Sequence, residues 1–559
     1  MTASLPICRV PESKTGVSLD LSMAARHGLV TGATGTGKTV TLQALAQGFS
    51  DAGVSVFCCD VKGDLSGIAA PGGNNPKIGA AFGKLGLPEP AWKSCPAAFW
   101  DVFGKKGHPL RATVSDLGPL LMGRLMGLSD VQADSLRLLF RIADEKGLPV
   151  LDLADLRTLI GWATENAAAL KAEYGLLSSA SLGALQRSVL VLEDSGADRF
   201  FGEPALEIGD LIRTAPDGRG MVHVLSSEDL MAEPALYATV LLHLLGELFE
   251  ELPEAGDLSK PRLILLLDEA HLLFDDAPKA LVDAVERTAR LVRSKGVGLW
   301  LVTQSPLDVP ESVLGQLGNR VHHALRAYTP KDRKAVDSVA NSLRPNPRVD
   351  AAAAITELGV GEALVSFLDA DGRPTPVERA RVVPPASRIG PLSPEERSAL
   401  VAASPLGARY DRAVDRESAY EILRSRMASF GSSGPGGSAR AGFGTAAASS
   451  ANGRGAAREP TIEEIEAELR GWPMPSRAEP EYPDYAEEPP VRRTPASRSS
   501  GGSRPAARTG SRSSRPTGYS DSVGSFAEEL ARRALSAAGR ELGRQVVRGL
   551  LGTPSRRRR

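Results

Sequence analysis

The sequence predicts an α/β protein with a mostly parallel sheet, an inserted helical subdomain and a long, largely disordered C-terminal tail. Short apolar runs of strand length alternate with segments whose apolar residues recur every three or four positions, a pattern typical of parallel sheets covered by helices. Between residues 117 and 213 the helical period continues with few strand signals. From residue 429 onward glycine, serine, alanine, proline and arginine dominate, so little apolar surface is available to form a core.

These changes of pattern divide the chain into six predicted parts. The core would be discontinuous in sequence, because the helical insertion separates its two segments. The predicted bounds are 1–116 and 214–390 for the two segments of the core, 117–213 for the helical insertion, 391–428 for a helical extension, 429–525 for a low-complexity linker and 526–559 for a basic amphipathic C-terminal helix.

Charge is distributed unevenly along a chain whose formal net charge is -1. Residues 491–559 contain sixteen arginines and no lysine against four acidic residues, a net charge of +12, so the rest of the chain is acidic. The last predicted helix combines several of these arginines with an apolar side, so it can dock on the protein itself, on a partner, on a membrane surface or on nucleic acid. Any electrostatic argument for nucleic acid must therefore treat tail and body separately.

The sequence shows no sign of secretion or of membrane insertion. The first residues lack a charged start followed by a long apolar stretch, and no apolar run approaches the roughly 20 residues that span a bilayer. The four cysteines, at positions 8, 58, 59 and 95, show no spacing typical of metal ligands. We therefore expect a cytoplasmic protein with reduced, structural cysteines and no integral membrane segment.

Residues 32–39 read Gly-Ala-Thr-Gly-Thr-Gly-Lys-Thr and lie where a short apolar strand passes into a helical pattern. This context is typical of a phosphate-binding loop, in which glycines let backbone N–H groups surround a phosphate. Lys38 can then bridge the β- and γ-phosphates, and Thr39 can hold Mg²⁺. The predicted nucleotide-binding residues are Gly32, Ala33, Thr34, Gly35, Thr36, Gly37, Lys38, Thr39 and Val40.

The same glycines also resemble the fingerprint of a dinucleotide-binding fold, in which Lys38 would be incidental. A second motif decides between the two interpretations. Asp268 and Glu269 follow Leu263–Leu267, an apolar run typical of a strand covered on both faces. There Asp268 can hold the Mg²⁺ shell, and Glu269 can polarise the water that attacks the γ-phosphate. A dinucleotide-binding fold has no use for this pair, so the predicted cofactors are ATP and Mg²⁺, with Thr39 and Asp268 at the metal.

Another predicted strand, residues 54–59, ends in the polar sequence Asp60-Val61-Lys62-Gly63-Asp64. If this strand is parallel and lies beside the first one, its polar end faces the nucleotide or its metal. An ordinary exit from a strand into a loop explains the same residues equally well. Beyond it, residues 72–98 are rich in glycine and proline and are predicted to form a loop.

Three further positions are candidates for sensing or completing the site. Gln304 ends a predicted strand, 298–304, next to the strand of the acidic pair, where it can orient the attacking water or simply terminate a strand. Arg320 opens a later strand and is either an arginine finger or a structural residue. The predicted catalytic residues are Lys38, Glu269, Gln304 and Arg320. A predicted helix carries Arg287, Arg290 and Arg293 on one side. This group is either a second source of an arginine finger or a solvated helix face.

The ends of the core carry weaker signals. Residues 1–28 form a short lead-in, too short for a separate domain. Two alternating segments, 363–368 and 377–383, are predicted to pair antiparallel and to close the edge of the sheet. After the core, Ser393 followed by Pro394 predicts the start of a helix.

Taken together, these motifs resemble the HerA-like branch of the HerA and FtsK superfamily of P-loop motor ATPases, and within it the YjgR type of helicase-like protein. The resemblance rests on residues 27–39, 60–64, 267–271, 303–306 and 317–320. It extends over roughly residues 15–390 and also over the terminal basic helix.

The resemblance implies a RecA-like α/β core that assembles as a ring, usually a hexamer, with ATP at the subunit interfaces. Related motors pull duplex DNA through the ring. The family's functional residues match this chain at Lys38 and Thr39 of Walker A, Asp268 and Glu269 of Walker B, Gln304 as sensor and Arg320 as candidate finger. HerA proper carries a β-barrel before its phosphate loop that helps nuclease docking, whereas 31 residues precede Gly32 here, so no nuclease partner is identifiable.

The function predicted on these grounds is that of an ATP-hydrolysing ring motor, a DNA translocase or helicase-like ATPase that acts as a homo-oligomer. Two alternatives stay open at this stage. One is an ATPase that remodels or translocates protein, as ring ATPases of secretion and conjugation do, and the other is a slow nucleotide-gated scaffold. The spelling Asp-Glu-Ala-His at 268–271 also marks another helicase superfamily, but neither its paired-arginine motif nor the Asn-Lys-x-Asp motif of GTPases occurs in the sequence.

Overall fold

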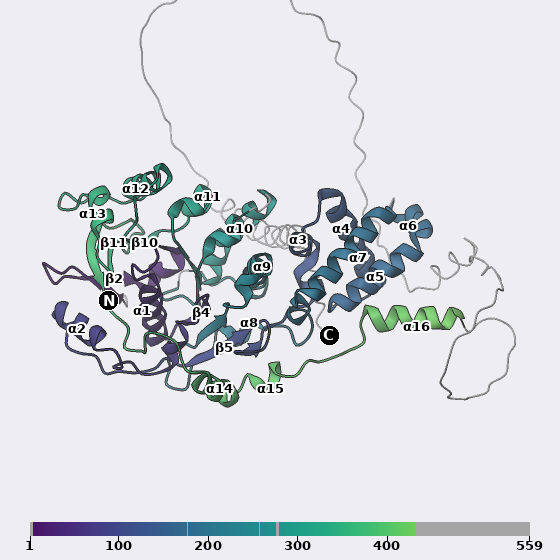
Figure 1. The fold of residues 1–559 in the computed structure, drawn as a ribbon, viewed down its shortest axis with the longest axis horizontal. Coiled ribbons are helices and arrows are strands. Elements are labelled where there is room, and N and C mark those ends of the chain that lie inside the picture. The colour runs from purple at the N-terminus through teal and green to yellow at the C-terminus, as the bar shows by residue number, and fades with distance from the viewer. Residues whose placement is uncertain (1–3, 176, 257, 276–278, 432–559) are drawn as a thin grey trace, which may run out of the picture. The chain divides into compact units, whose positions relative to one another are not determined.

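The computed structural model describes residues 4–431 apart from 176, 257 and 276–278, and the predicted linker and basic helix lie outside these residues (Figure 1). The strands of the described part are β1 Ser4–Arg9, β2 Gly16–Asp20, β3 Gly28–Thr31, β4 Ser55–Asp60, β5 Ala97–Asp101, β6 His108–Pro109, β7 Val222–Ser226, β8 Leu263–Leu267, β9 Val297–Thr303, β10 Asn319–His323, β11 Glu362–Ser366 and β12 Glu378–Val382.

The helices of the same part begin and end as follows: α1 Lys38–Asp51, α2 Pro76–Lys84, α3 Val114–Leu125, α4 Asp130–Lys146, α5 Leu153–Glu165, α6 Ala167–Tyr174, α7 Ser179–Asp194, α8 Ile208–Leu211, α9 Pro234–Glu251, α10 Lys279–Val292, α11 Glu311–Leu314, α12 Pro330–Ser342, α13 Ala351–Glu357, α14 Pro394–Ala403, α15 Gly407–Tyr410 and α16 Ala419–Gly431.

All the strands join one sheet in the order β2-β1-β12-β11-β10-β3-β9-β8-β4-β7-β5-β6. From β10 to β6 every neighbouring pair is parallel, and from β10 to β2 every pair is antiparallel. The carboxyl ends of the parallel strands therefore share one edge, where ligands of open α/β sheets bind. The predicted α/β class with a mostly parallel sheet is confirmed.

Helices cover both faces of the parallel part, as the unbroken apolar strands predict. Strand β8 shows the division: Leu263, Leu265 and Leu267 join the core that contains α9 and α10. Its other two residues, Ile264 and Leu266, join the core that contains the apolar side of α1. Apolar residues on both sides explain why this strand reads as a continuous run and not as an alternating one.

Strand β9 lies between β3 and β8, so the phosphate-loop strand and the acidic-pair strand are not neighbours. Strand β4 pairs with β8 and β7 instead of with β3. The expectation that the 54–59 strand lies beside the first one is therefore wrong. The reason is that two fully buried strands from far downstream, β8 and β9, occupy the central positions between them.

The antiparallel end of the sheet extends further than predicted. Strands β11 and β12 do pair antiparallel, but they do not close the edge. Strand β1 pairs with β12 through Cys8 and Val382, and β2 lies outside β1 as the last strand. The lead-in is thus a β-hairpin, which reads weakly in the sequence because several residues of β2 remain at least partly exposed, as edge strands do.

Helix α2 lies inside the segment predicted to be a loop. Asn75 caps it by accepting a hydrogen bond from the Lys77 N–H at 3.1 Å, and Pro76 occupies the first turn. Both residues favour a helix start. The glycines and prolines around the helix obscured this short signal.

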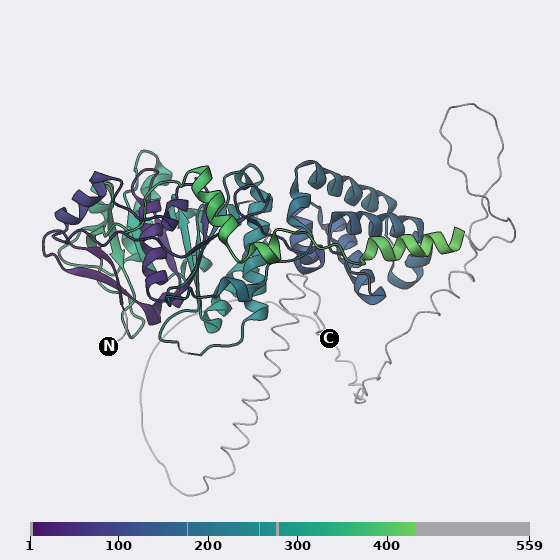
Figure 2. The same cartoon turned by 90° about the horizontal axis from the view of Figure 1, so that it is seen from below.

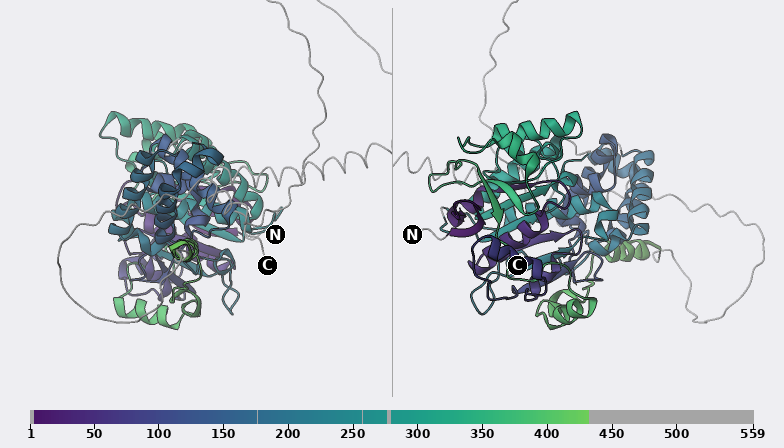
Figure 3. Two further views of the ribbon diagram at one scale, coloured as in Figure 1. Left: turned by 90° about the vertical axis from the view of Figure 1, so that its right-hand side faces the viewer. Right: turned by 60° about the vertical axis from the view of Figure 1, so that its left-hand side comes forward.

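The helical insertion forms a bundle of its own beside the sheet, as the blue helices of Figure 2 and Figure 3 show. Leucines at helical spacing, such as Leu136, Leu159 and Leu185, are fully buried in it. Helix α16 packs on α5, where Asp155 accepts a hydrogen bond from the Tyr420 N–H at 2.8 Å. Among the described residues no single helix has the length and hydropathy of a bilayer span, and the bent pair α6 and α7 reaches them only when its two helices are counted together.

Candidate functional site

The phosphate loop turns from β3 into α1 at the carboxyl edge of the sheet. Gly32, Gly35 and Gly37 have φ angles of 153°, 78° and 117°, which favour glycine. A Cβ on Gly32 would also lie 2.5 Å from the Cβ of His323 on β10. The loop therefore needs its glycines both for conformation and for close packing, as the motif predicts.

The loop rests on residues that the sequence did not point to. The Thr36 carbonyl accepts a hydrogen bond from the Gly361 N–H, and the Ala33 N–H donates to the Ala324 carbonyl, both at 2.9 Å. His323 Nε2 lies 2.8 Å from the Thr41 hydroxyl of α1. Burial lowers the pKa of His323 to about 4, so this ring is neutral at physiological pH. Histidines in a strand carry no recognisable signal for such a supporting role.

Lys38 begins α1 and points its ammonium back across the loop. Its Nζ donates to the Gly32 carbonyl and, at 3.4 Å, to the Ala33 carbonyl. Burial lowers its pKa, while the nearby charges of Asp268 and Glu269 raise it. The structure thus brings Lys38 together with the acidic pair, although one strand, β9, lies between β3 and β8, the strands that precede them.

The acidic pair follows β8 directly, where the backbone turns sharply. Glu269 has a φ of 48°, a left-handed conformation that is strained for a residue other than glycine. Its N–H donates to Asp268 Oδ1 at 2.9 Å, and the Tyr237 hydroxyl donates to the Asp268 carbonyl at 2.6 Å. Burial, followed by the charge of Glu269, raises the pKa of Asp268 to about 6.

The Glu269 carboxylate is buried without being satisfied. Its side chain belongs to a residue that is 7% exposed, and among the described residues Oε2 has no hydrogen-bond partner. His271 Nδ1 lies 3.4 Å from this oxygen. A buried carboxylate oxygen that lacks a donor costs free energy, so this atom is positioned for something other than the fold.

A third strand end adds two residues that were not assigned to the site. Asp64, in the turn after β4, faces the Thr39 hydroxyl, and that contact lowers its pKa, although burial raises the pKa overall. The charge of Lys62 acts on Asp64, Asp268 and Lys38. Of the two interpretations of residues 60–64, the geometry favours the one in which they face the phosphate loop.

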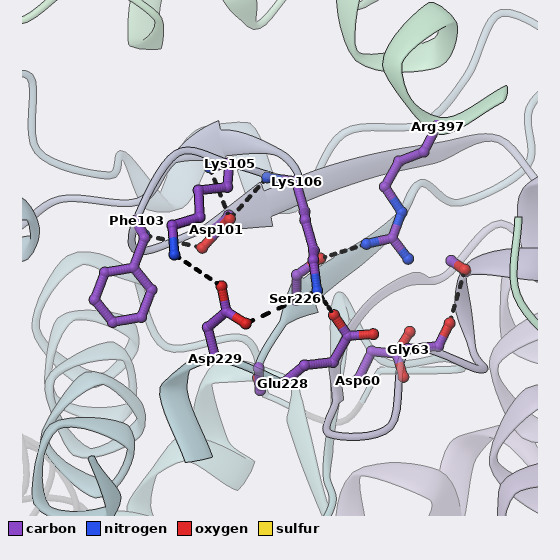
Figure 4. Close-up of polar contacts among 12 residues, drawn as sticks. Asp60, Gly63, Asp101, Phe103, Lys105, Lys106, Ser226, Glu228, Asp229 and Arg397 are labelled. Atoms are coloured by element: carbon purple, nitrogen blue, oxygen red, sulfur yellow. Dashed lines mark hydrogen bonds and ion pairs between the residues drawn. The ribbon is translucent and has the colours of Figure 1, made fainter. Parts of the chain in front are cut away.

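The turn that carries Lys62 and Asp64 is held firmly (Figure 4). Asp60 Oδ2 accepts the Leu65 N–H at 3.1 Å, and the Ser66 hydroxyl donates to the Gly63 carbonyl at 2.9 Å. Gly63 has a φ of 76°, and a Cβ on it would lie 1.7 Å from Glu228 Oε1. The Asp60 carboxylate and the neighbouring Glu228 side chain therefore fix the position of this turn.

Farther along the same edge, the ends of β5 and β7 form a network of paired charges (Figure 4). Asp101 accepts backbone N–H groups of residues 103, 105 and 106 at 2.8 to 2.9 Å. Lys105 pairs with Asp229 at 3.1 Å, and Lys106 pairs with Glu228. The carboxylates of this cluster are largely satisfied by the protein itself.

Gln304 lies at the carboxyl end of β9, beside the strand of the acidic pair as predicted, and β9 also adjoins the phosphate-loop strand β3. Its side chain is exposed and faces a hollow of about 500 Å³ that Ala33 and His271 also line. The preceding Thr303 is buried, and its hydroxyl donates to Asp308 at 3.0 Å. Gln304 is thus the residue of this strand end that is free to contact a ligand.

Arg320 does not join the other candidates within the chain. It pairs in register with Leu29, two residues before Thr31 at the end of β3, and its guanidinium donates to the Leu314 carbonyl at 3.2 Å. Burial lowers its pKa. Of the arginines of α10, Arg290 pairs with Glu286 at 2.7 Å on the same helix. An arginine finger from either place stays a prediction.

The residues at the site fit a polyphosphate with a divalent cation. The first N–H groups of α1 have no acceptor within the helix and point toward the loop, as helix geometry requires. Lys38 now uses carbonyls of the loop as acceptors, and the orphaned Glu269 Oε2 lies in the same group of charges. Hydroxyl and carboxylate oxygens, from Thr39, Asp64 and Asp268, are ligands that Mg²⁺ accepts directly or through water.

Comparison with known proteins gives sequence matches to DNA helicases and structural matches to a conjugative coupling protein and to VirB4. A DNA double-strand break repair helicase HerA from Sulfolobus acidocaldarius is 25% identical over 359 residues, which are 63% of this chain and 64% of the relative. A probable helicase, MJECL08, from Methanocaldococcus jannaschii is 32% identical over 130 residues, 22% of this chain and 23% of the relative. This chain therefore spans less than two thirds of the length of these relatives.

Two solved structures align over a larger share. The bacterial conjugative coupling protein TrwBdeltaN70 aligns with 68% of this chain and 92% of its own, at 18% identity and a TM-score of 0.45. VirB4 of Thermoanaerobacter pseudethanolicus aligns with 68% of this chain and 97% of its own, at 14% identity and a TM-score of 0.46. The family model described as helicase HerA-like C-terminal matches residues 7–456. Since that match takes in the sheet and every motif at its carboxyl edge, the chain belongs to the helicase HerA-like C-terminal family.

Proposed function

We propose that this chain is an Mg²⁺-dependent ATPase motor that acts on DNA as a translocase or helicase. The observation that carries the proposal is the meeting of Lys38, Asp268 and the unsatisfied Glu269 carboxylate at one edge of the sheet, with Gln304 on the strand between them. DNA as the client is supported by the relatives, which are named DNA double-strand break repair helicases.

Each residue has a role that its position allows. The loop from Gly32 to Val40 binds the phosphates through backbone N–H groups, and Lys38 binds the β- and γ-phosphates once it leaves its carbonyl acceptors. Thr39 and Asp268, with Asp64 facing the Thr39 hydroxyl, would hold the Mg²⁺ shell, and the metal would neutralise phosphate charge. Glu269 orients the attacking water and accepts its proton, and Gln304 holds that water in line.

A homo-oligomeric ring, of which a hexamer is the expected form, is part of the same proposal. Within one chain Arg320 donates to the Leu314 carbonyl and lies away from Lys38. A stabilising arginine would therefore come from a neighbouring chain, as it does in motors with the nucleotide between subunits. The divisions at residues 116, 213, 390, 428 and 525 also stay proposals, with the helical insertion and the tail as separate units.

The test is ATP turnover by the full-length chain with and without duplex and single-stranded DNA, measured over a series of salt concentrations. We expect turnover to rise with DNA at low salt and the rise to shrink as salt increases, because phosphate contacts release counterions. Lys38→Ala should lower turnover about 10²-fold or more, since it removes a charge that acts on the transferring phosphoryl group. Lys77→Ala, an exposed lysine on α2, is the matched control and should behave as the wild type.

The other possible outcomes each contradict one part of the proposal. DNA-independent turnover at every salt concentration would contradict the DNA client and leave the protein-remodelling alternative. Turnover that survives in Lys38→Ala would contradict the site itself. A rate too slow to measure in the wild type, together with tight ATP binding, would favour the nucleotide-gated scaffold.

A further inference from the structure

The chain from the end of β10 into the first turns of α12, at the top of Figure 1, carries four exposed cations and one exposed tyrosine. We refer to residues 326–334 as the β10–α12 segment. Its exposed cations are Arg326, Lys331, Arg333 and Lys334, and Tyr328 is exposed as well. Among the described residues none of its four cations forms an ion pair within 4.0 Å. These charges are therefore available to an external anion.

The position of three of these cations is unfavourable for the helix that carries them. Thr329 caps α12, so Lys331, Arg333 and Lys334 lie in its first turns, where the helix dipole disfavours positive charge. The needs of the helix end are met by Asp332, which accepts the N–H groups of Tyr328 and Thr329 at 3.1 and 2.9 Å. Helix stability thus gives no reason for three cations here, whereas binding of a polyanion does.

The tyrosine has no packing role that explains its place. Tyr328 is 81% exposed, the largest value among the large apolar side chains of the described residues. A single exposed leucine or valine is ordinary, but an aromatic ring set between cations offers a face on which a base can stack and a hydroxyl for a phosphate. The ring and the cations together match a nucleic-acid strand better than they match a free phosphate.

The segment borders the nucleotide site. Arg326 and Lys331 line the hollow of about 500 Å³ whose other wall includes Ala33, His271 and Gln304. Two carboxylates of this hollow are already occupied, because Asp308 accepts from Thr303 and Ser305 and Asp332 caps α12. Asp275 lies 4.0 Å from His271. An anion bound along the β10–α12 segment would therefore border the same hollow as Ala33 of the phosphate loop and Gln304.

We propose that the β10–α12 segment is the site at which this motor contacts DNA. Its cations bind backbone phosphates and Tyr328 stacks on an exposed base, so that DNA occupancy reaches Gln304 and the phosphate loop across the hollow. The inference rests on the proposed function, since it names the DNA contact of that ATPase. A neighbouring copy of the chain is the other occupant to consider, because the body of the chain is acidic, but a copy gives no role to the Tyr328 ring, which is 81% exposed.

The experiment measures binding of fluorescently labelled duplex and single-stranded DNA by anisotropy, using full-length chains over a salt series. The test variant is Lys331→Ala/Arg333→Ala/Lys334→Ala, and the control with the same charge change is Lys77→Ala/Lys84→Ala/Lys171→Ala, three exposed lysines on α2 and α6. Losing three phosphate contacts should reduce the slope of log affinity against log salt by about 2 to 3 for duplex DNA. The control should keep the wild-type slope. The arginine-rich residues 491–559 are the same in both variants, so their contribution to DNA affinity is equal in the two.

Tyr328 is tested separately. Tyr328→Ala should weaken binding of single-stranded DNA about tenfold, because one base loses its stacking partner, and Tyr328→Phe should restore it. The ratio of DNA-stimulated to DNA-free turnover should fall in the triple variant and in Tyr328→Ala.

Several results would overturn the inference. One is a triple variant with the affinity and slope of the control. Another is a smaller assembly by light scattering with unchanged DNA affinity, which would assign the segment to a contact between copies. A third is a higher KM for ATP with unchanged DNA binding, which would assign it to nucleotide. Wild-type turnover that ignores DNA would instead fail the proposed function, so the two failures are distinguishable.

Discussion

Two groups of carboxylates occupy the same edge of the sheet and differ in what the protein provides for them. At the ends of β5 and β7, Asp101 accepts three backbone N–H groups and Asp229 pairs with Lys105. At the end of β8, Glu269 has a buried oxygen without a donor and a left-handed backbone. Both groups are acidic and lie at strand ends, so residue type and strand position alone do not separate a structural carboxylate from a catalytic one.

The two groups differ in hydrogen bonding, and this difference identifies the end of β8 as the part of the edge that is arranged for a ligand. A satisfied carboxylate stabilises its turn, whereas an unsatisfied one is tolerated only where another need holds it. Asp60 stands between the two groups, because one of its oxygens accepts the Leu65 N–H and the other has no partner among the described residues. Changing a carboxylate to its amide should therefore affect turnover and stability differently in the two groups.

The largest effect is expected for Glu269→Gln, which should lower ATP turnover about 10²- to 10⁴-fold by removing the proton acceptor while leaving the fold intact. Asp229→Asn is the matched change in the other group and should leave turnover within about twofold, because its partner Lys105 is largely exposed. Steady-state rates together with circular dichroism check both. Equal losses in the two variants would abolish the distinction between the groups.

The next effect concerns pH. Burial raises the pKa of Asp60 to about 6, whereas an unfolded aspartate titrates near 3.9. Between about pH 4 and 6 the folded state binds the proton more tightly, so the free energy of unfolding falls as pH rises through this window. Asp60→Asn cannot ionise and should be more stable than the wild type above pH 6, by at most about 3 kcal/mol, with no advantage below pH 4.

The matched substitution Asp101→Asn should act in the opposite direction. An amide cannot accept at both of its atoms, so at least one of the three N–H groups loses its acceptor, at a cost of about 1 to 3 kcal/mol at neutral pH. Urea denaturation of both variants at pH 4 and pH 7.5 measures the contrast. A stabilised Asp101→Asn, or an Asp60→Asn that is destabilised at pH 7.5, would reverse the assignment.

A smaller effect should be seen at Asp64, which sharpens the boundary of the catalytic group. Asp64→Asn should raise the Mg²⁺ concentration for half-maximal turnover about tenfold, since a carboxylate facing Thr39 contributes charge to the metal site. The rate at saturating Mg²⁺ should largely recover. A Mg²⁺ titration of turnover tests this prediction. An unchanged midpoint would mean that residues 60–64 are a simple loop and do not contribute to the metal site.

The smallest effect is expected for Lys105→Ala, which removes the pair with Asp229. The two side chains are 58% and 43% exposed, so the pair should contribute less than about 1 kcal/mol, and added salt should reduce even that. Thermal unfolding at two salt concentrations measures it. A loss well above 1 kcal/mol would mean that the paired cluster is more than a solvated surface.

Much of the site could be predicted from the sequence because each motif combines a backbone signal with a chemical one. The run Leu263–Leu267 predicts a buried strand, and the acidic residues that follow predict chemistry at its end. The glycine loop is similarly read both as a turn and as a phosphate site. The placement of Gln304 followed from the same reasoning.

What could not be predicted depends on contacts between residues far apart in sequence. The order of strands, with β9 between β3 and β8, is decided by pairing that no local pattern contains. The support of the loop by His323 and Gly361 is of the same kind, as is the contact between Asp64 and Thr39. The hairpin of β1 and β2 was missed because β2 is a partly exposed edge strand, and because β12, which joins the hairpin to the sheet, lies far downstream.

The pairing of β3 with β10 also sets an order of events during synthesis on the ribosome. Thr31, at the start of the phosphate loop, contacts His322, which is 291 positions later. At about 5 to 20 residues per second, roughly 15 to 60 s pass between the two. Until then the phosphate loop has left the ribosome but β10, the strand on which it rests, has not been made. The helical insertion, in contrast, is continuous in sequence and is complete by that time. A nascent chain therefore cannot hold nucleotide until most of its core has been made.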